Sequence, residues 1–203
     1  MGQRKGAFIV IEGCDGAGTT TQAQRLQGRL QAAGHRAHVT CEPSKGWIGQ
    51  QIRERLRGAP PDDEGYQLLA LLFAADRMAH MADEMRGQLD DGVHVLCDRY
   101  VLSSLVYQGL HVDEGWVRQL NQHAAAPDLT LVIDVTVEES LRRQQVRGAQ
   151  KEIYDDGDLL RRIRQRYLTL REEVGGVLID GEDTVDVITD RLWAHVAPVV
   201  GLA

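Results

Sequence analysis

The chain has 203 residues, of which 43% are hydrophobic and 26% charged, and its formal net charge at pH 7 is −7. This composition excludes a disordered chain, and the acidic balance argues against a nucleic-acid-binding surface, which needs clustered Lys and Arg. No apolar run reaches the roughly 18 residues of a membrane span, and the first residues lack the apolar core of a signal peptide. Three cysteines fit a reducing compartment, so we expect a cytoplasmic protein with one domain over residues 1–203 and no membrane partner.

Short apolar runs rich in β-branched residues alternate with longer helical patterns along the chain. The expected strands span residues 7–12, 36–41, 93–97, 129–135 and 177–180. The expected helices span residues 20–33, 47–57, 63–89, 101–109, 113–125, 137–147, 158–173 and 184–196, and a polar loop spans 148–157. Such alternation predicts an α/β fold with a doubly wound, five-stranded parallel sheet and helices on both faces.

A glycine-rich segment joins the first expected strand to the first expected helix. Its glycines allow backbone N–H groups to converge on an anion, and the helix N-terminus adds the positive end of its dipole. In this context the pattern G-x-x-x-x-G-K-[ST] binds nucleotide phosphates, with the final hydroxyl on Mg²⁺, although a purely structural turn is the alternative. The residues expected around the phosphates are Gly13, Cys14, Asp15, Gly16, Ala17, Gly18, Thr19 and Thr20, of which Thr20 is the expected metal ligand. Asp15 is an unusual anion beside phosphates, so we expect it to accept a hydrogen bond from a sugar hydroxyl of a second substrate.

The third expected strand leads into Asp98, Arg99 and Tyr100. The C-terminal ends of parallel strands meet at one edge of the sheet, where ligands bind. Arg99 can bind a phosphate through two parallel hydrogen bonds, while Asp98 lies near Mg²⁺ or orients Arg99. The alternative is an exposed ion pair that follows a strand.

The helix expected at 63–89 carries Phe73 and Arg77 four residues apart, and therefore on one face. A ring and a guanidinium on the same face suit stacking and hydrogen bonding to a planar base. Taken alone, the pattern favours the simpler alternative, a face packed in the core with an arginine that reaches solvent.

The sequence resembles the thymidylate kinase family, whose members phosphorylate dTMP to dTDP with MgATP. The resemblance runs from Phe8 to about Trp193 and rests on residues 8–18, 42–43, 72–77, 98–108, 127–134 and 143–148. The stretch D-R-Y-x-x-S-x-x-x-Y-Q at 98–108 is its most specific part. The resemblance implies a P-loop NTPase-type fold with a short lid at about 148–157, ATP and dTMP as substrates, Mg²⁺ as cofactor and a homodimer that packs through helices such as 63–89.

The resemblance also implies a role for each matching residue. Asp15 would bind the deoxyribose 3′-hydroxyl, Phe73 would stack on thymine, and Arg99 would hold the monophosphate. Tyr107 would pack under the deoxyribose and leave no room for a 2′-hydroxyl. The dTMP-binding set implied in this way is Asp15, Phe73, Arg77, Arg99, Ser104, Tyr107 and Gln108, and residues near 181–183 would approach adenine.

The chain departs from the family pattern at Thr19, which stands where the phosphate loop has lysine. The missing ammonium group would neutralise the β- and γ-phosphates, and its loss costs about 10- to 150-fold in rate. Many relatives also have Arg-Glu-Pro where this chain has Cys41-Glu42-Pro43, so a second cation is absent. We expect a working kinase whose lid supplies the charge, although a weakly catalytic or non-catalytic nucleotide-binding relative and a related nucleoside or nucleotide kinase are alternatives. The expected catalytic set is Asp15, Arg99, Arg143, Arg147 and Lys151.

Overall fold

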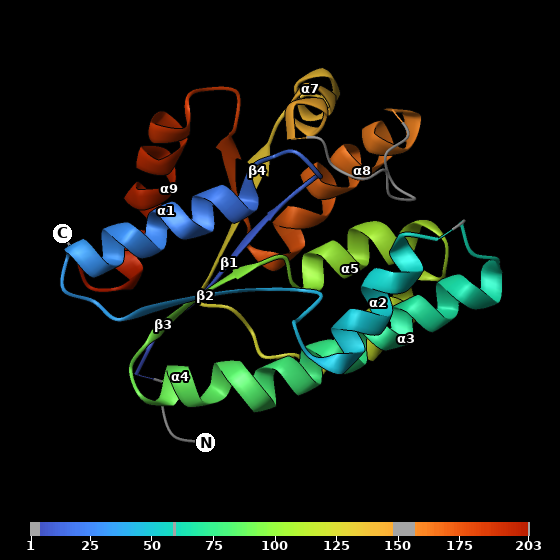
Figure 1. Ribbon diagram of the computed structural model, residues 1–203, viewed down its shortest axis with the longest axis horizontal. Coiled ribbons are helices and arrows are strands. Elements are labelled where there is room, and N and C mark those ends of the chain that lie inside the picture. The colour runs from blue at the N-terminus through green and yellow to red at the C-terminus, as the bar shows by residue number, and fades with distance from the viewer. Residues whose placement is uncertain (1–4, 59, 148–156, 203) are drawn as a thin grey trace.

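A single sheet of five parallel strands, in the order β2-β3-β1-β4-β5, forms the centre of the protein (Figure 1). The structure is a computed structural model that describes residues 5–58, 60–147 and 157–202. The strands are β1 (Phe8–Gly13), β2 (Ala37–Cys41), β3 (His94–Asp98), β4 (Leu129–Asp134) and β5 (Val177–Asp180). The predicted α/β class, the number of strands and their parallel pairing are confirmed.

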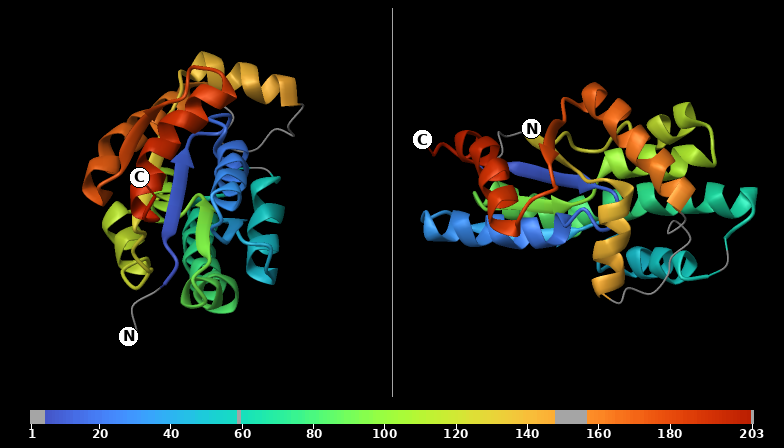
Figure 2. Two further views of the ribbon diagram at one scale, coloured as in Figure 1. Left: turned by 90° about the vertical axis from the view of Figure 1, so that its left-hand side faces the viewer. Right: turned by 90° about the horizontal axis from the view of Figure 1, so that it is seen from above.

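Helices cover both faces of this sheet (Figures 1 and 2). They are α1 (Thr19–Ala32), α2 (Trp47–Leu56), α3 (Asp63–His80), α4 (Arg86–Asp90), α5 (Val101–Tyr107), α6 (Glu114–Leu120), α7 (Val137–Arg147), α8 (Gly157–Leu170) and α9 (Val185–Val199). Shorter helical segments are η1 (Met81–Met85), η2 (Gln108–Leu110) and η3 (Arg171–Val174). None of the helices within the described ranges is long and apolar enough to cross a membrane.

The central strand β1 is buried along its whole length. Its alternate side chains face opposite sides of the sheet. Ile9 and Ile11 belong to the larger core with Leu26 and Leu30 of α1, whereas Phe8 and Val10 pack with Met81, Met85 and Leu89 from the other layer. An apolar strand buried on both faces is typical of a parallel sheet.

The chain reverses its order of winding at β1, because β3 lies on one side of this strand and β4 on the other. Ile11 is in register with Asp98 of β3, and Gly13 is in register with Ile133 of β4. Ligands of open α/β sheets bind at such a switch point, beyond the C-terminal ends of the strands. The glycine-rich loop, Asp98 and Arg99 therefore all emerge at this place.

The long helix differs from the prediction, because a π-helical segment, η1, interrupts residues 63–89 between α3 and α4. The N–H of Arg86 donates to the carbonyl of Met81, the wider spacing of a π turn. Met81, Met85 and Leu89, which are four residues apart, pack against Phe8 and Val10 of β1.

The helix expected at 113–125 is also shorter than predicted. Asp113 caps this helix, since its carboxylate accepts from the N–H of Trp116 at 2.8 Å, but α6 ends at Leu120. The side-chain amide of Asn121 donates to the carbonyl of Val117 at 2.8 Å, a local bond that competes with continued helix. The other predicted elements differ by a few residues at their ends.

Candidate active site

The glycine-rich loop runs from β1 into the N-terminus of α1. Gly16 and Gly18 have φ angles of 83° and 93°, in the left-handed region that favours glycine. A Cβ atom on Gly13 would lie 2.8 Å from the carbonyl oxygen of Ile133, so the close approach of β4 also requires glycine there. Gly18 caps α1 without a side-chain hydrogen bond, which leaves the first N–H groups of the helix available to an anion.

The threonine in place of the loop lysine lies inside this turn. Thr19 is buried, and its Cγ2 lies 3.3 Å from the position that a Cβ on Gly13 would take. The side chain therefore fills space beneath the loop and adds no positive charge. A cation that neutralised phosphates bound at this loop would therefore come from another element.

Of the three predicted replacement cations, only Arg143 has a described side chain. It lies on α7, where Nη1 donates to the carbonyl of Ala17 at 3.4 Å and Nη2 donates to the carbonyl of Gly181 at 2.8 Å. Its Nε donates to Glu139 at 2.6 Å. Arg143 thus joins the phosphate loop to the segment that was predicted to approach adenine. The side chain of Arg147, Lys151 and all of the predicted lid except Gly157 lie outside the described residues.

The two predicted metal ligands are adjacent. The hydroxyl of Thr20 donates to Oδ2 of Asp98, across the gap between α1 and β3. Oδ1 of Asp98 is buried and has no hydrogen-bond partner among the described residues. A carboxylate oxygen without a partner beside a hydroxyl fits the oxygen ligands that Mg²⁺ prefers.

Asp15, a residue of the phosphate loop, pairs through its side chain with Arg99. Arg99 Nη2 donates to Asp15 Oδ1 at 2.7 Å, and the hydroxyl of Tyr107 donates to Oδ2 at 3.1 Å. Arg99 Nη1 lies 3.2 Å from the same hydroxyl and 3.1 Å from that of Tyr167. The backbone of Arg99 has φ 70°, a strained conformation for a non-glycine residue and one often found at functional sites.

Two residues that hold this arrangement were missed by sequence reasoning. Glu12, fully buried in β1, accepts from the N–H of Tyr100 at 2.9 Å and from the hydroxyl of Ser103 at 2.5 Å. Tyr167 of α8 donates to the same carboxylate at 3.3 Å. Burial raises the pKa of Glu12 above its usual value, although Ser103 and Arg99 favour the charged form. A charged residue in an otherwise apolar strand was the available signal for Glu12, whereas no sequence feature pointed to Tyr167.

A cavity of about 390 Å³ extends from this pair toward α3. Most predicted dTMP-binding residues line it together with both predicted metal ligands: Asp15, Thr20, Phe73, Arg77, Asp98, Arg99, Ser104, Tyr107 and Gln108. Oε1 of Gln108 is buried without a hydrogen-bond partner among the described residues. The volume suits a small molecule, and an unpaired amide group at its wall is available to a ligand.

The wall of this cavity also contains two cations that the sequence did not single out, Arg53 and Arg57. Arg53 of α2 donates to the carbonyls of Pro43 and Ser44, the latter at 2.5 Å. It lies beside Cys41, whose thiol pKa is raised by burial and only partly lowered by this guanidinium. Strand two itself ends without a cation, as expected from Cys41-Glu42-Pro43, and Arg53 of α2 is a cation that lies close to this strand end.

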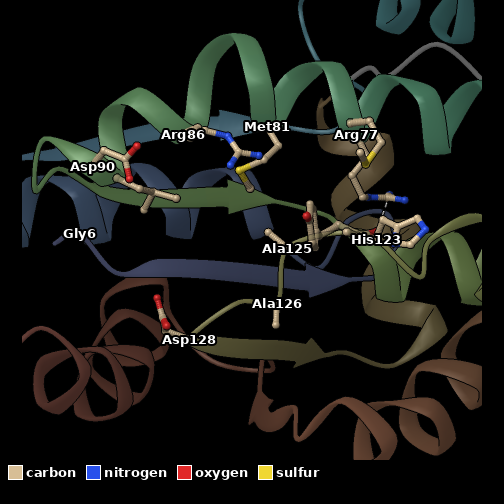
Figure 3. A pocket seen from close by; sticks show the side chains of 13 residues that line it. Gly6, Arg77, Met81, Arg86, Asp90, His123, Ala125, Ala126 and Asp128 are labelled. Carbon is tan, nitrogen blue, oxygen red and sulfur yellow. Dashed lines mark hydrogen bonds between the residues drawn. The ribbon is translucent and has the colours of Figure 1, made fainter. Parts of the chain in front are cut away.

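A larger cavity of about 630 Å³ lies on the other side of Arg77, between α3, α4 and the segment after α6 (Figure 3). Its walls include Met78, Met81 and His123, and no residue of the phosphate loop. Size alone would favour this cavity. The smaller one contains the groups that can bind phosphate, metal and base.

The sheet order, the glycine-rich loop at the switch point and the Thr20–Asp98 pair define a P-loop nucleotide-binding protein of the kinase type. The family model described as thymidylate kinase matches residues 11–192. The chain is 40% identical to a thymidylate kinase of Thermomicrobium roseum over 95% of both chains. It is 41% identical to a probable thymidylate kinase of Methanococcus aeolicus over 82% of this chain and 80% of that one, and 40% identical to one of Pyrococcus horikoshii over 83% and 84%. The chain belongs to the thymidylate kinase family.

Proposed function

We propose that this protein transfers the γ-phosphoryl group of ATP to dTMP and forms dTDP, in a single P-loop nucleoside monophosphate kinase domain. The observation that carries this proposal is the 390 Å³ cavity, whose lining combines residues suited to phosphate and metal, Thr20, Asp98 and Arg99, with residues suited to a base, Phe73, Arg77 and Gln108. Asp15 of the phosphate loop and Arg99 pair with each other and line this cavity, which we call the acceptor cavity because dTMP would bind in it. Phe73, Arg77 and Gln108 line the part toward α3.

In the proposed reaction the protein aligns two phosphates and neutralises their charge, since phosphoryl transfer requires little covalent chemistry from the enzyme. The backbone N–H groups of the loop and the N-terminus of α1 hold the donor phosphates. Arg99 binds the acceptor phosphate, and Asp15 exchanges its pairing with Arg99 for a hydrogen bond from the 3′-hydroxyl of the sugar. Burial raises the pKa of Tyr107 and of Tyr167, so both remain neutral phenols that can donate hydrogen bonds in this site.

Thr20 and Asp98 would hold Mg²⁺, the second part of the proposal. The metal would supply positive charge to the donor phosphates during transfer. Asp98 Oδ1, which is buried and has no hydrogen-bond partner within the described ranges, supports this assignment, because a buried carboxylate oxygen is costly without a partner.

The missing loop lysine is replaced, in this proposal, by a cation of α7 or of the lid. Arg143, Arg147 and Lys151 are the candidates, and each is tested by its alanine variant. Loss of the replacing cation should lower kcat by at least about two orders of magnitude, toward the range known for such cations in phosphoryl transfer. If all three variants keep wild-type kcat, neither α7 nor the lid supplies the charge.

A coupled assay of ADP release with dTMP, ATP and Mg²⁺ tests the function itself. We expect turnover with dTMP and compare it with dUMP, dGMP and thymidine. Tight binding of ATP and dTMP without ADP release would instead identify a non-catalytic relative. Turnover with thymidine in preference to dTMP would identify a nucleoside kinase.

Exclusion of ribonucleotides is a separate part of this proposal. The ring of Tyr107 is buried, and the guanidinium of Arg99 lies over it at 5.2 Å. We expect Tyr107→Ala to lower the preference for dTMP over its ribo counterpart by about ten-fold or more, the value of removing one steric exclusion. An unchanged preference would contradict the assigned role.

We also propose a homodimer that packs through α3. Leu69 is buried and Leu72 packs against the same core, so these two apolar residues of α3 belong to the core of the monomer. The exposed stripe lies elsewhere on the helix: Leu68, Leu71 and Met78 are 41%, 46% and 51% exposed, with Ala75 and Ala82 also exposed between and after them. Their alternating spacing of three and four residues is typical of helices that pack against a partner helix.

Leu71→Glu should shift the molar mass measured by light scattering from dimer to monomer. Val146→Glu is the matched control, since Val146 is an exposed apolar residue on α7, outside this stripe. A monomeric wild type, or an unshifted Leu71→Glu, would contradict the proposed interface.

A further inference from the structure

Most N–H groups of the Arg77 guanidinium donate hydrogen bonds to other residues of the protein. The guanidinium makes four hydrogen bonds: Nε to Glu42 at 2.9 Å, Nη1 to Asn121, and Nη2 to the carbonyl of Tyr100 at 3.1 Å and to Ser104 at 3.0 Å. An arginine has five N–H groups, so one Nη1 N–H is left without a hydrogen-bond partner in the described part of the chain. Since Arg77 lines the acceptor cavity, the direction of this single N–H depends on how firmly the other four are held.

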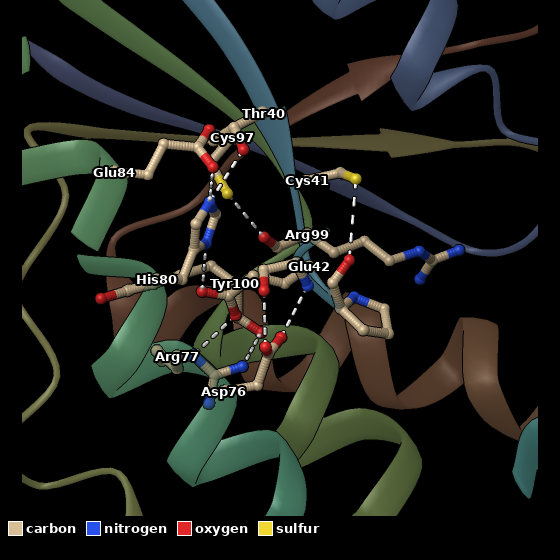
Figure 4. Close-up of polar contacts among 12 residues, drawn as sticks. Thr40, Cys41, Glu42, Asp76, Arg77, His80, Glu84, Cys97, Arg99 and Tyr100 are labelled. Carbon is tan, nitrogen blue, oxygen red and sulfur yellow. Dashed lines mark hydrogen bonds and ion pairs between the residues drawn. The ribbon is translucent and has the colours of Figure 1, made fainter. Parts of the chain in front are cut away.

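Glu42 is the only one of these partners that carries a negative charge. Its side chain and that of Arg77 are each 2% exposed. Arg77 takes Oε2, and Nδ1 of His80 lies 3.3 Å from Oε1 (Figure 4). The carboxylate is therefore held from both sides, and its orientation depends on His80.

His80 lies one turn after Arg77 in the chain, and both of its ring nitrogens have partners. Nε2 lies 2.8 Å from the hydroxyl of Thr40 and 3.6 Å from Oε2 of Glu84. Burial alone would lower the pKa of His80, but the hydrogen bond to Glu42 and the negative charges of Glu42, Glu84 and Asp76 outweigh it and raise this pKa.

Besides Glu42, the carboxylates of Asp76 and Glu84 lie near His80. Asp76 is engaged by the N–H and hydroxyl of Ser44, both at 2.6 Å. Glu84 also pairs with His38 of β2 at 2.8 Å. The acids around His80 are thus fixed by other partners, and only its Nδ1 contacts the carboxylate that holds Arg77.

Glu42, His80 and Cys97 have ligand atoms within 4.8 Å of one another, which raises the possibility of a buried metal site. The bonding argues against it. Arg77 already neutralises Glu42, both nitrogens of His80 are occupied, and the Cys97 sulfur lies 3.2 Å from the carbonyl of Arg99, the geometry of a thiol donor. The cluster is organised around the arginine.

We infer that His80 is a positioning residue for the acceptor base: it fixes Glu42, and Glu42 directs the remaining N–H of Arg77 toward a ring carbonyl of the bound nucleotide. This inference rests on the proposed function. It connects a residue outside the cavity lining to the recognition of the base, through one carboxylate.

Two variants separate the two bonds of His80. His80→Asn places an amide donor near Nδ1 and keeps the bond to Glu42, whereas His80→Gln reaches the position of Nε2 and keeps only the contact with Thr40. Each is assayed with dTMP and with analogues that carry sulfur in place of one ring carbonyl oxygen, because sulfur is a poorer hydrogen-bond acceptor. His94→Gln is the control, another buried histidine that bonds the N–H of Ala7 at 3.0 Å and lies away from this network.

In the wild type, one sulfur analogue should lose about ten-fold in kcat/KM, the effect of one weakened bond to a charged donor. His80→Asn and His94→Gln should retain this ten-fold loss. His80→Gln should reduce the loss to about two-fold or less, because Glu42 no longer directs the N–H of Arg77 toward the ring carbonyl of the nucleotide. His80→Leu replaces His80→Gln if the latter does not fold. An unchanged sulfur effect in the variant that lacks the Glu42 bond overturns the inference, whereas a wild type that forms no dTDP overturns the proposed function instead.

Discussion

Arg143 is the one candidate for the missing lysine charge whose side chain is described, and its removal gives a quantitative test. Its Nη1 is bound to the carbonyl of Ala17 at 3.4 Å, a long and therefore weak hydrogen bond. A phosphate placed in the loop would be a stronger acceptor than this carbonyl. We expect Nη1 to turn to the phosphate while the bonds to Glu139 and Gly181 keep the guanidinium in place.

The size of the effect follows from the number of N–H groups that can turn. One hydrogen bond to a charged group contributes about 1.5–3 kcal/mol, which corresponds to about 10- to 150-fold in rate. Both N–H groups of Nη1 together would bring the loss to the upper part of this range or beyond. Arg143→Ala should therefore lower kcat by about 100-fold.

The assay is ADP release under saturating dTMP, with ATP varied so that kcat and KM are separated. Arg142→Ala is the matched control, because Arg142 also pairs with Glu139, at 2.6 Å, but its side chain is 63% exposed and forms no hydrogen bond to the loop among the described residues. Thr19→Lys should restore more activity in the Arg143→Ala background than it adds to the wild type. An Arg143→Ala variant with kcat within about three-fold of the wild type, or with a loss no greater than that of Arg142→Ala, refutes this reasoning and leaves Arg147 and Lys151.

Three further predictions concern the groups around the acceptor cavity. Glu42→Gln should lower the free energy of unfolding by about 3–5 kcal/mol, because it leaves the buried guanidinium of Arg77 without its counter-charge; urea denaturation measures this, and a loss below about 1 kcal/mol would contradict it. The pKa of His80 is raised in the folded protein, so protonation of its ring stabilises the fold. This stabilisation is complete below the pKa of the unfolded chain, about 6.5, and it is lost as the pH rises through the pKa of the folded protein. Urea unfolding from pH 6 to 9 should show the free energy of unfolding declining in the wild type but not in His80→Asn. Identical pH profiles of the two proteins would exclude a contribution from protonation of His80. Asp98→Asn should raise the Mg²⁺ concentration for half-maximal activity by about ten-fold or more, and an unchanged Mg²⁺ dependence would remove Asp98 from the metal site.

Much of the site was predictable because its parts lie at the ends of strands. Once the strands were recognised as parallel, the loop after the first and the Asp98–Arg99 step after the third had to meet at one edge of the sheet. Gly16 and Gly18 fit the same reasoning, since their positive φ angles are local requirements of the turn. Local pattern and strand direction together therefore predicted the phosphate end of the cavity.

Other features depended on contacts between distant segments. Arg53 reaches the cavity from α2, and Tyr167 reaches the carboxylate of Glu12 over 155 residues of sequence. Neither has a short-range signal, because the partner that gives the residue its role is supplied by another part of the fold.

By itself, the sequence determined the α/β class, the phosphate loop and the absence of a lysine from it, since each follows from residue type and near spacing. Only the tertiary structure decided what surrounds Thr19: a buried side chain under the loop, with Arg143 of α7 beside the loop carbonyl. It also decided that the carboxylate of Glu42, which follows β2, lies between Arg77 and His80 of α3. Charges that compensate or orient one another across such distances are set by packing, and packing is a property of the whole fold.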